Sequence, residues 1–345
     1  MPASCIVRAV DRRRRGGPGT ASALWPPCVE AKIAPAEPMP PSYVGRFAPS
    51  PSGPLHFGSL VAAAGSYLEA RCAGGRWLLR IEDVDRPRTV AGAEAQILRQ
   101  LEALGFEWEL DPWRQSERDQ AYRAALASLR ECAQVFDCGC SRREIADSAL
   151  APDGAPRYPG TCRNGLAAGR QARTVRLRTE AGVEICFDDA VQGRVCEDVG
   201  TAVGDFVLQR ADGLFAYQLA VVVDDAASGV TDVVRGADLI DSTCRQIWLQ
   251  RCLGLPTPRY MHLPVAINGY GNKLSKQSRA RAIDPSRPAP ALVAALAFLG
   301  QQPPDALAGG SPATIWRWAI DHWRPEAIPP RRSIRADAEF WEEDA

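Results

Sequence analysis

Residues 43–71, YVGRFAPSPSGPLHFGSLVAAAGSYLEAR, decide the fold of this chain. An extended run is followed by a turn rich in proline, serine and glycine and then by a helix with small residues on one face. A second strand and a second helix follow, which gives a βαβα order and predicts a parallel sheet with right-handed crossovers. We expect strands at 43–47 and 77–81, the turn at 49–53, and helices at 59–71 and about 89–104.

The rest of the chain extends this pattern after an interruption. Further strands are expected at 206–209, 233–235 and 261–267, and helices at about 217–226 and 242–253. Residues 138–204 break the alternation with turns and with hairpin-like runs at 174–178 and 183–187. The chain is therefore predicted to be α/β: a doubly wound, Rossmann-type parallel sheet with an inserted subdomain and a short helical C-terminal part. The predicted divisions are a disordered extension (1–41), the first half of the Rossmann-type domain (42–137), the insertion (138–204), the second half (205–268) and a lysine-bearing loop with a short helical region (269–345).

Composition limits the class of protein. With 345 residues, 46% hydrophobic and 24% charged, the chain is typical of a soluble globular protein of one large domain or two, not of a disordered or fibrous one. No apolar run reaches the roughly 18 residues that a membrane span needs. Because 41 basic residues balance 41 acidic ones, local basic patches must hold any nucleic-acid partner.

The first forty residues show neither helical nor strand periodicity, and Met39 directly precedes the first strand. We expect Met39 to be the true start, and a basic nucleic-acid arm or a transit peptide is the alternative. Eleven cysteines without an apolar signal core favour a reducing compartment and free thiols. The cysteines outside the motif described below are predicted to be small core residues: Cys72, Cys132, Cys186, Cys196, Cys244 and Cys252.

The turn between the first strand and the first helix is a candidate phosphate site. Backbone N–H groups at a helix start can face phosphate, and Gly53 and Gly58 allow a ligand to approach the backbone closely. His56 can donate a hydrogen bond to a phosphate oxygen. An ordinary turn with an incidental histidine is the alternative.

Two lysines form a second candidate motif. The chain has three lysines against 38 arginines, and Lys273 and Lys276 stand three residues apart in a polar, glycine-containing loop. A lysine on a flexible stem can follow a phosphate through a reaction. A solvated surface loop is the alternative.

Three cysteines form a third motif inside the predicted insertion. Cys138, Cys140 and Cys162 lie within 25 residues, and three thiolates are good ligands for tetrahedral zinc, needing one further oxygen or nitrogen donor. Reduced structural cysteines are the alternative.

Together, the histidine and lysine motifs resemble the HIGH and KMSKS signatures of class I aminoacyl-tRNA synthetases, and the resemblance is closest to the glutamyl branch. It covers residues 43–281 and includes three further signatures: Arg46-Phe-Ala-Pro-Ser-Pro-Ser-Gly, Leu79-Arg-Ile-Glu82-Asp83-Val-Asp85 and Val234-Arg235-Gly-Ala-Asp238-Leu. Two departures concern the phosphate motifs: Ser59 replaces the second histidine of HIGH, and the lysine motif ends in Gln277. They leave most of the phosphate work to His56 and Lys276.

The resemblance implies a role for each matching residue. His56 and Lys276 would be catalytic. The ATP-binding set would be His56, Gly58, Ser59, Lys273 and Lys276, with Mg²⁺ bound to the nucleotide. The glutamate-binding set would be Arg46, Phe47, Ala48, Pro49, Ser50, Glu82, Tyr217 and Arg235. Tyr158 would be the fourth ligand of a structural zinc ion. Residues 138–204 would then be a zinc-braced subdomain inserted between the two halves of a catalytic domain. Direct pairing of Arg46 with Glu82 is the alternative to their substrate roles.

The resemblance also implies an activity. Residues 278–345 are too few for a separate anticodon-reading domain. Within the glutamyl branch this is the arrangement of a short paralogue that activates L-glutamate with ATP without tRNA and passes it to queuosine at the wobble position of tRNA(Asp). We therefore expect a cytoplasmic, monomeric ligase that takes ATP, L-glutamate and queuosine-bearing tRNA(Asp). The alternatives are a compact glutamyl-tRNA synthetase, another glutamate ligase, or an inactive paralogue that binds tRNA or glutamate.

Overall fold

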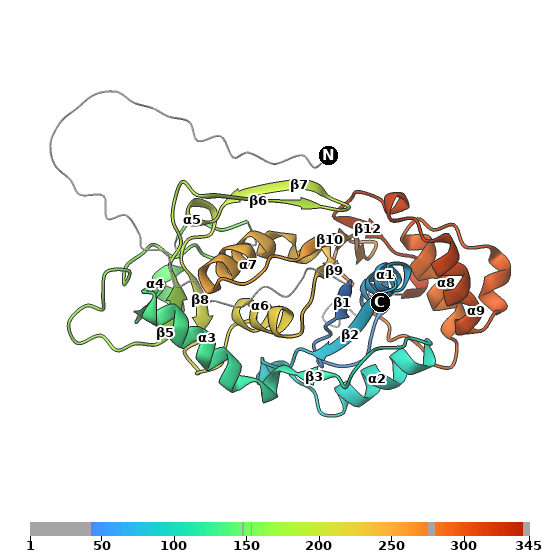
Figure 1. The fold of residues 1–345 in the computed structure, drawn as a ribbon, viewed down its shortest axis with the longest axis horizontal. Coiled ribbons are helices and arrows are strands. Elements are labelled where there is room, and N and C mark those ends of the chain that lie inside the picture. The colour runs from blue at the N-terminus through green and yellow to red at the C-terminus, as the bar shows by residue number, and fades with distance from the viewer. Residues whose placement is uncertain (1–42, 147, 153, 275–279, 341–345) are drawn as a thin grey trace, which may run out of the picture. The chain divides into compact units, whose positions relative to one another are not determined.

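The computed structural model describes residues 43–340 except 147, 153 and 275–279 (Figure 1). The predicted extension, 1–41, and the residues Met39, Lys276 and Gln277 lie outside the described residues. None of the described helices is long and apolar enough to cross a membrane.

The first half of the parallel sheet forms as expected. Strands β1 (Val44–Phe47), β2 (Arg76–Ile81) and β3 (Trp113–Arg114) pair in parallel in the order β1-β2-β3. Helix α1 (Phe57–Cys72) connects the first two strands, and α2 (Ala93–Ala103) precedes the third. The second helix begins at Ala93, later than predicted, because Gly92 before it adopts a left-handed backbone conformation with φ 78°.

The second half is built around two more parallel strands, β9 (Asp232–Gly236) and β10 (Arg259–Leu263). Helix α6 (Tyr217–Ala227) precedes β9, and α7 (Ile240–Leu253) connects β9 to β10. Strand β9 lies beside β1, where the N–H of Thr231 donates to the carbonyl of Val44 at 3.0 Å. The two halves of the chain therefore meet between β1 and β9, and ligands of open α/β sheets bind at the carboxyl ends of strands where the strand order reverses.

The middle of the chain pairs differently from the prediction. Strands β4 (Val135–Cys138), β5 (Thr174–Leu177) and β8 (Phe206–Gln209) form a separate antiparallel sheet. Strand β6 (Glu184–Asp189) makes a hairpin with β7 (Gly193–Asp198) and pairs in parallel with β10. Residues 206–209, expected in the parallel sheet, instead form β8 and pair antiparallel with β5.

The remaining elements complete the two sides of the molecule. Helix α3 (Asp119–Glu131) packs against α6, whereas α8 (Pro288–Phe298) and α9 (Pro312–His322) pack against α1 (Figure 1). Strand β11 (Val265–Ile267) pairs in parallel with β12 (Ser333–Arg335). Two short helices, α4 (Arg142–Ile145) and α5 (Val199–Ala202), lie in the middle segment.

The sheet is covered by apolar side chains on both faces. Adjacent residues of β2 point to opposite sides, so that Leu78 joins the buried cluster with α3 and α6, and Leu79 joins the cluster with α1 and α8. On the α1 side the helix approaches the sheet closely. A Cβ atom at Gly65 would lie 2.5 Å from Cδ1 of Leu263. The small residues recognised in the sequence are thus those that let α1 pack directly above the strands.

Candidate active site

The loop between β1 and α1 is shaped by its glycine and its histidine. Gly53 has φ 133°, a conformation that residues with side chains rarely adopt. His56 is the N-cap of α1, and its Nδ1 accepts a hydrogen bond from the N–H of Ser59 at 3.3 Å. Its Nε2 lies 3.1 Å from the Ser59 hydroxyl. The serine that replaces the second histidine of HIGH therefore holds the imidazole ring at the helix start.

The distant lysine segment lies beside this loop. Leu274 is fully buried, and its carbonyl oxygen would be 3.5 Å from a Cβ atom placed on Gly58. The N–H of Ile283 donates to the carbonyl of Leu55 at 2.9 Å. Lys273, on the same segment, forms an ion pair with Asp238 of the β9–α7 connection. Two segments about 200 residues apart are thus joined at one place in the fold.

A cavity of about 1120 Å³ unites the predicted ligand-binding groups. The described residues of the ATP-binding and glutamate-binding sets all line it: Arg46, Phe47, Ala48, Pro49, Ser50, His56, Gly58, Ser59, Glu82, Tyr217, Arg235 and Lys273. The cavity runs from the start of α1 to the carboxyl ends of β1, β2 and β9. Lys276, the remaining predicted ATP ligand, lies outside the described residues.

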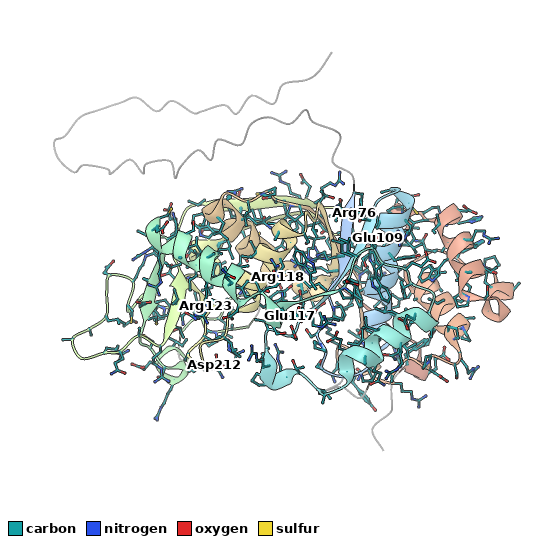
Figure 2. The ribbon with its side chains drawn as sticks, turned by 60° about the horizontal axis from the view of Figure 1, so that its bottom comes forward. Arg76, Glu109, Glu117, Arg118, Arg123 and Asp212 are labelled. Atoms are coloured by element: carbon teal, nitrogen blue, oxygen red, sulfur yellow. A yellow bond between two sulfur atoms is a disulfide. The ribbon has the colours of Figure 1, made fainter. Side chains whose placement is uncertain are left out.

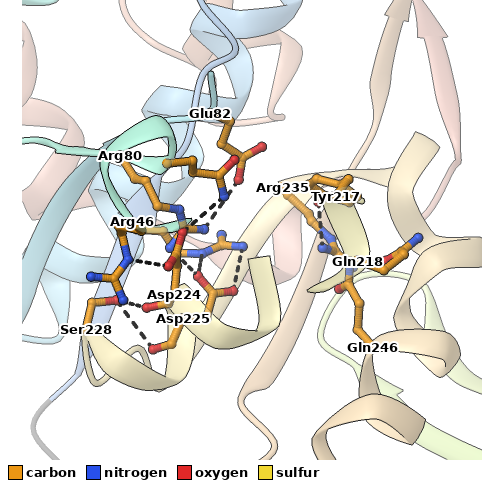
Figure 3. Close-up of polar contacts among 12 residues, drawn as sticks. Arg46, Arg80, Glu82, Tyr217, Gln218, Asp224, Asp225, Ser228, Arg235 and Gln246 are labelled. Atoms are coloured by element: carbon orange, nitrogen blue, oxygen red, sulfur yellow. Dashed lines mark hydrogen bonds and ion pairs between the residues drawn. The ribbon is translucent and has the colours of Figure 1, made fainter. Parts of the chain in front are cut away.

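Arg46 is held by a partner that the sequence did not reveal. Its Nε and Nη2 donate to the two carboxylate oxygens of Asp225 on α6, at 3.0 and 3.2 Å (Figure 3). Nη1 of Arg80 binds the same carboxylate at 2.7 Å. Burial would raise the pKa of Asp225, but the charges of Arg46 and Arg80 hold it below its ordinary value. One carboxylate therefore fixes two buried guanidinium groups beneath the cavity.

Glu82 directly follows β2 and is paired with Arg80, not with Arg46. Nη2 of Arg80 lies 3.4 Å from its carboxylate (Figure 3). Burial raises the pKa of Glu82, and the nearby charges of Arg80 and Arg46 only partly offset this effect. Direct pairing of Arg46 with Glu82, the alternative reading of these residues, is not how the structure satisfies them.

Arg235 and Tyr217 meet at the opposite end of the predicted glutamate site. Nη1 of Arg235 lies 3.5 Å from the hydroxyl of Tyr217, the first residue of α6 (Figure 3). Burial raises the pKa of this phenol, so that it remains a neutral hydrogen-bonding group. The cavity thus has guanidinium groups from β1 and β9 and a carboxylate from the residue that follows β2.

The predicted zinc ligands are brought together and buried. The sulfurs of Cys138, Cys140 and Cys162 all lie within 4.8 Å of one another, and those of Cys140 and Cys162 are 3.6 Å apart. The hydroxyl of Tyr158 is 3.4 Å from the Cys138 sulfur and 3.8 Å from the Cys140 sulfur. These four side chains, from one segment of the chain, can supply three sulfurs and one oxygen to a metal ion.

The other cysteines correct the prediction of core thiols. Cys186 and Cys196 face each other directly across the β6–β7 hairpin, with Cα atoms 4.1 Å apart, and are joined by a disulfide. Cys132 is also disulfide-bonded. Cys72 is exposed and Cys252 half-buried, so that of these six residues only Cys244 is a buried free thiol. Helical or strand periodicity places a cysteine on a face, but it does not show which strand lies opposite.

Comparison with known proteins defines the class. A family model described as the catalytic domain of class I tRNA synthetases (E and Q) matches residues 43–303. The chain therefore belongs to this family and is a ligase of the aminoacyl-tRNA synthetase type, as the motifs indicated. A glutamate-tRNA synthetase structure from Elizabethkingia anophelis is similar in fold, with a TM-score of 0.70 and 24% identity, over 86% of this chain and 68% of that one.

Two relatives are similar over nearly their whole length. The chain is 61% identical to the glutamyl-Q tRNA(Asp) synthetase of Dechloromonas aromatica over 294 residues, which are 85% of this chain and 97% of that protein. It is 60% identical to the glutamyl-Q tRNA(Asp) synthetase of Aromatoleum aromaticum over 298 residues, 86% of this chain and 93% of that protein.

Proposed function

We propose that this enzyme activates L-glutamate with ATP, without tRNA, and transfers it to queuosine at the wobble position of tRNA(Asp). The observation that carries the proposal is the single cavity that joins the His56 loop to Arg46, Glu82, Tyr217 and Arg235. A phosphate-binding helix start and a pocket for a charged amino acid are both parts of this cavity. The 60–61% identity to two glutamyl-Q tRNA(Asp) synthetases supports the choice of queuosine in tRNA(Asp) as the acceptor.

The first step needs positioning more than acid–base chemistry. An α-carboxyl group has a pKa of about 3.3 to 3.7, so that glutamate enters as an ionised nucleophile at neutral pH. Its oxygen attacks the α-phosphate of ATP, and pyrophosphate leaves from the opposite side. His56 and Lys276 stabilise the charge that develops on the phosphate oxygens. Mg²⁺ bound with ATP supplies further positive charge.

Glutamate brings two carboxylates and one ammonium into a partly desolvated pocket, and each requires a partner. Arg46 and Arg235 are assigned to the carboxylates, and Glu82 to the ammonium. Tyr217 adds a hydrogen bond beside Arg235. Residues 47–50 border the same space, which keeps the substrate next to the phosphate loop.

The cysteine cluster is assigned to a structural zinc ion. Tetrahedral zinc with Zn–S bonds of about 2.3 Å separates two sulfurs by about 3.8 Å. The 3.6 Å between the Cys140 and Cys162 sulfurs and the 3.4 Å between the Cys138 sulfur and the Tyr158 oxygen fit this geometry. With four protein ligands the site is closed, so that the ion would brace the inserted segment and leave no open position for substrate.

The second step transfers the glutamyl group. A hydroxyl of the queuosine cyclopentenediol attacks the carbonyl carbon of glutamyl-adenylate, and AMP leaves; its phosphate can accept the hydroxyl proton. We infer that the reaction takes place in the cytoplasm, and we expect a monomer to carry it out.

Two assays test the proposal in sequence. Glutamate-dependent ATP–pyrophosphate exchange without tRNA tests the first step. Labelled glutamate with tRNA(Asp), carrying either queuosine or guanosine at the wobble position, tests the second, and nuclease digestion locates the label. We expect exchange without tRNA and label only in the anticodon fragment of the queuosine-bearing tRNA. Label at the 3′ adenosine would instead identify a compact glutamyl-tRNA synthetase, and absence of exchange would identify an inactive binding paralogue.

A further inference from the structure

Arg235 is held by groups from three other elements. Its Nε donates to Nε2 of His262 on β10 at 3.0 Å, and its Nη2 donates to the Thr243 hydroxyl on α7 at 2.9 Å. Its Nη1 lies beside the hydroxyl of Tyr217, which lines the cavity. Nε and Nη2 are therefore occupied by the protein, and Nη1 is the nitrogen positioned toward a ligand in the cavity.

His262 is the partner that reaches deepest into the protein. The residue is 0% exposed, and its Nδ1 lies 2.6 Å from a carboxylate oxygen of Asp189 at the end of β6. The other oxygen of Asp189 accepts backbone N–H groups of Val191, Gln192 and His262 itself, at 3.0, 2.8 and 3.1 Å. The carboxylate is thus fixed by the hairpin turn and by β10 together.

The hydrogen-bond chemistry permits one protonation state of the imidazole. An arginine Nε–H can only donate, so Nε2 of His262 must accept and carries no proton. Nδ1 then carries the single proton and donates it to Asp189. Burial lowers the pKa of His262 to about 4, and the charge of Arg235 contributes in the same direction. The ring is therefore neutral and has a defined tautomer.

We propose that Asp189 and His262 are positioning residues that fix the orientation of Arg235 for a carboxylate of the substrate. The proposal rests on the proposed function in taking Arg235 as a glutamate ligand. Asp189 belongs to the segment predicted as an insertion, and through β6 and the β6–β10 pairing this segment would help to determine glutamate affinity.

Two substitutions of His262 separate positioning from packing. In H262Q the amide oxygen can occupy the place of Nε2 and accept from Arg235. In H262N the amide can reach Asp189 but not Arg235, whose Nε–H is left without its acceptor. We expect H262N to raise the KM for glutamate in ATP–pyrophosphate exchange by about 10- to 100-fold, with little change in the KM for ATP, and H262Q to restore much of the loss. Equal defects in the two variants, or equal effects on both substrates, would overturn the proposal.

The tautomer gives a second test that does not depend on activity. The chain has only three histidines, His56, His262 and His322, so that ¹⁵N-histidine labelling yields few signals and H262Q identifies the one of interest. At neutral pH we expect the shift pattern of a neutral ring protonated at Nδ1. A ring protonated at Nε2, or at both nitrogens, would refute the proposed chain of hydrogen bonds from Asp189 through His262 to Arg235. If the wild-type protein showed no glutamate-dependent exchange, the proposed function would be refuted instead. The tautomer of His262 could still be determined from the ¹⁵N spectrum.

Discussion

The carboxylate of Asp225 binds Arg46 through both of its oxygens, and one of these oxygens also binds Arg80. The side chains of both arginines are 4% exposed. Two cations next to a substrate pocket repel each other, and an anion between them offsets this repulsion. Asp225 therefore allows β1 and β2 to carry neighbouring guanidinium groups, one of which borders the pocket proposed for glutamate.

Removing Asp225 should destabilise the protein strongly. D225A leaves two buried guanidinium groups without their shared carboxylate, and we expect the free energy of unfolding to fall by about 3–5 kcal/mol. Urea denaturation followed by circular dichroism measures this. The control is D119A, which removes the pair of Asp119 with Arg123 on α3, where the side chains are 54% and 65% exposed. Figure 2 shows Arg123 on this helix. That loss should be within about 0.5 kcal/mol. Similar losses in both variants would contradict the role assigned to Asp225.

The ionised side chain of Glu82 should lower the stability of the folded protein, although the same side chain is assigned to substrate binding. Its pKa in the folded protein is raised by burial, so its ionisation favours the unfolded state, and stability falls as pH rises through the folded pKa. E82Q cannot ionise. We expect it to be more stable than the wild type at neutral pH, and the difference to disappear as pH falls below the ordinary range of glutamate. The same variant should lose glutamate-dependent exchange. Denaturant titrations at several pH values measure the first effect, and a variant less stable than wild type at pH 7 would show the sign to be wrong.

The two lysines of the polar loop should differ in their effects. We expect K276A to lower the rate of glutamyl-adenylate formation by about 10²- to 10³-fold, because a cation at the developing phosphate charge is lost, with little change in the Kd for glutamate. K273A is the matched control, since Lys273 forms an ion pair with Asp238, and its effect on the rate should be smaller. Single-turnover kinetics and equilibrium binding separate the two quantities. Equal losses of rate and glutamate affinity in K276A would exclude the role.

The sequence predicted the elements that are local and the residues that belong to motifs. The strand, turn and helix of residues 43–71 follow from periodicity and turn residues, and the described motif residues line one cavity. Pairing between distant strands was less accessible. Residues 206–209 were correctly predicted as a strand, but nothing in their own pattern shows that β5 is the neighbouring strand.

The residues that hold the site were missed for a related reason. Asp225 follows a buried apolar run, and Arg80 stands within a buried strand. Ionisable residues in such positions need a partner, which is a usable signal. His262 carries the same signal within β10. In each case the sequence marks a buried polar group, whereas only the fold identifies what it binds.

The zinc assignment gives a prediction that is independent of substrate. Removal of one ligand leaves three donors in a buried site, so C140S should lose bound zinc and destabilise the segment that the ion braces. Cys72, an exposed thiol remote in sequence from the cluster, provides the control C72S, which should retain the metal. Mass spectrometry of metal content on purified protein tests this, and limited proteolysis reports the state of residues 138–178. We expect about one zinc per chain in wild type and C72S, little in C140S, and faster cleavage of that segment in C140S alone. The assignment is wrong if C140S keeps its zinc. It is also wrong if the wild type binds none and residues 138–178 are cleaved equally fast in wild type and C140S. The buried cysteines would then be packing residues, and the fit of their sulfurs to a tetrahedral ion would have no bearing on the fold.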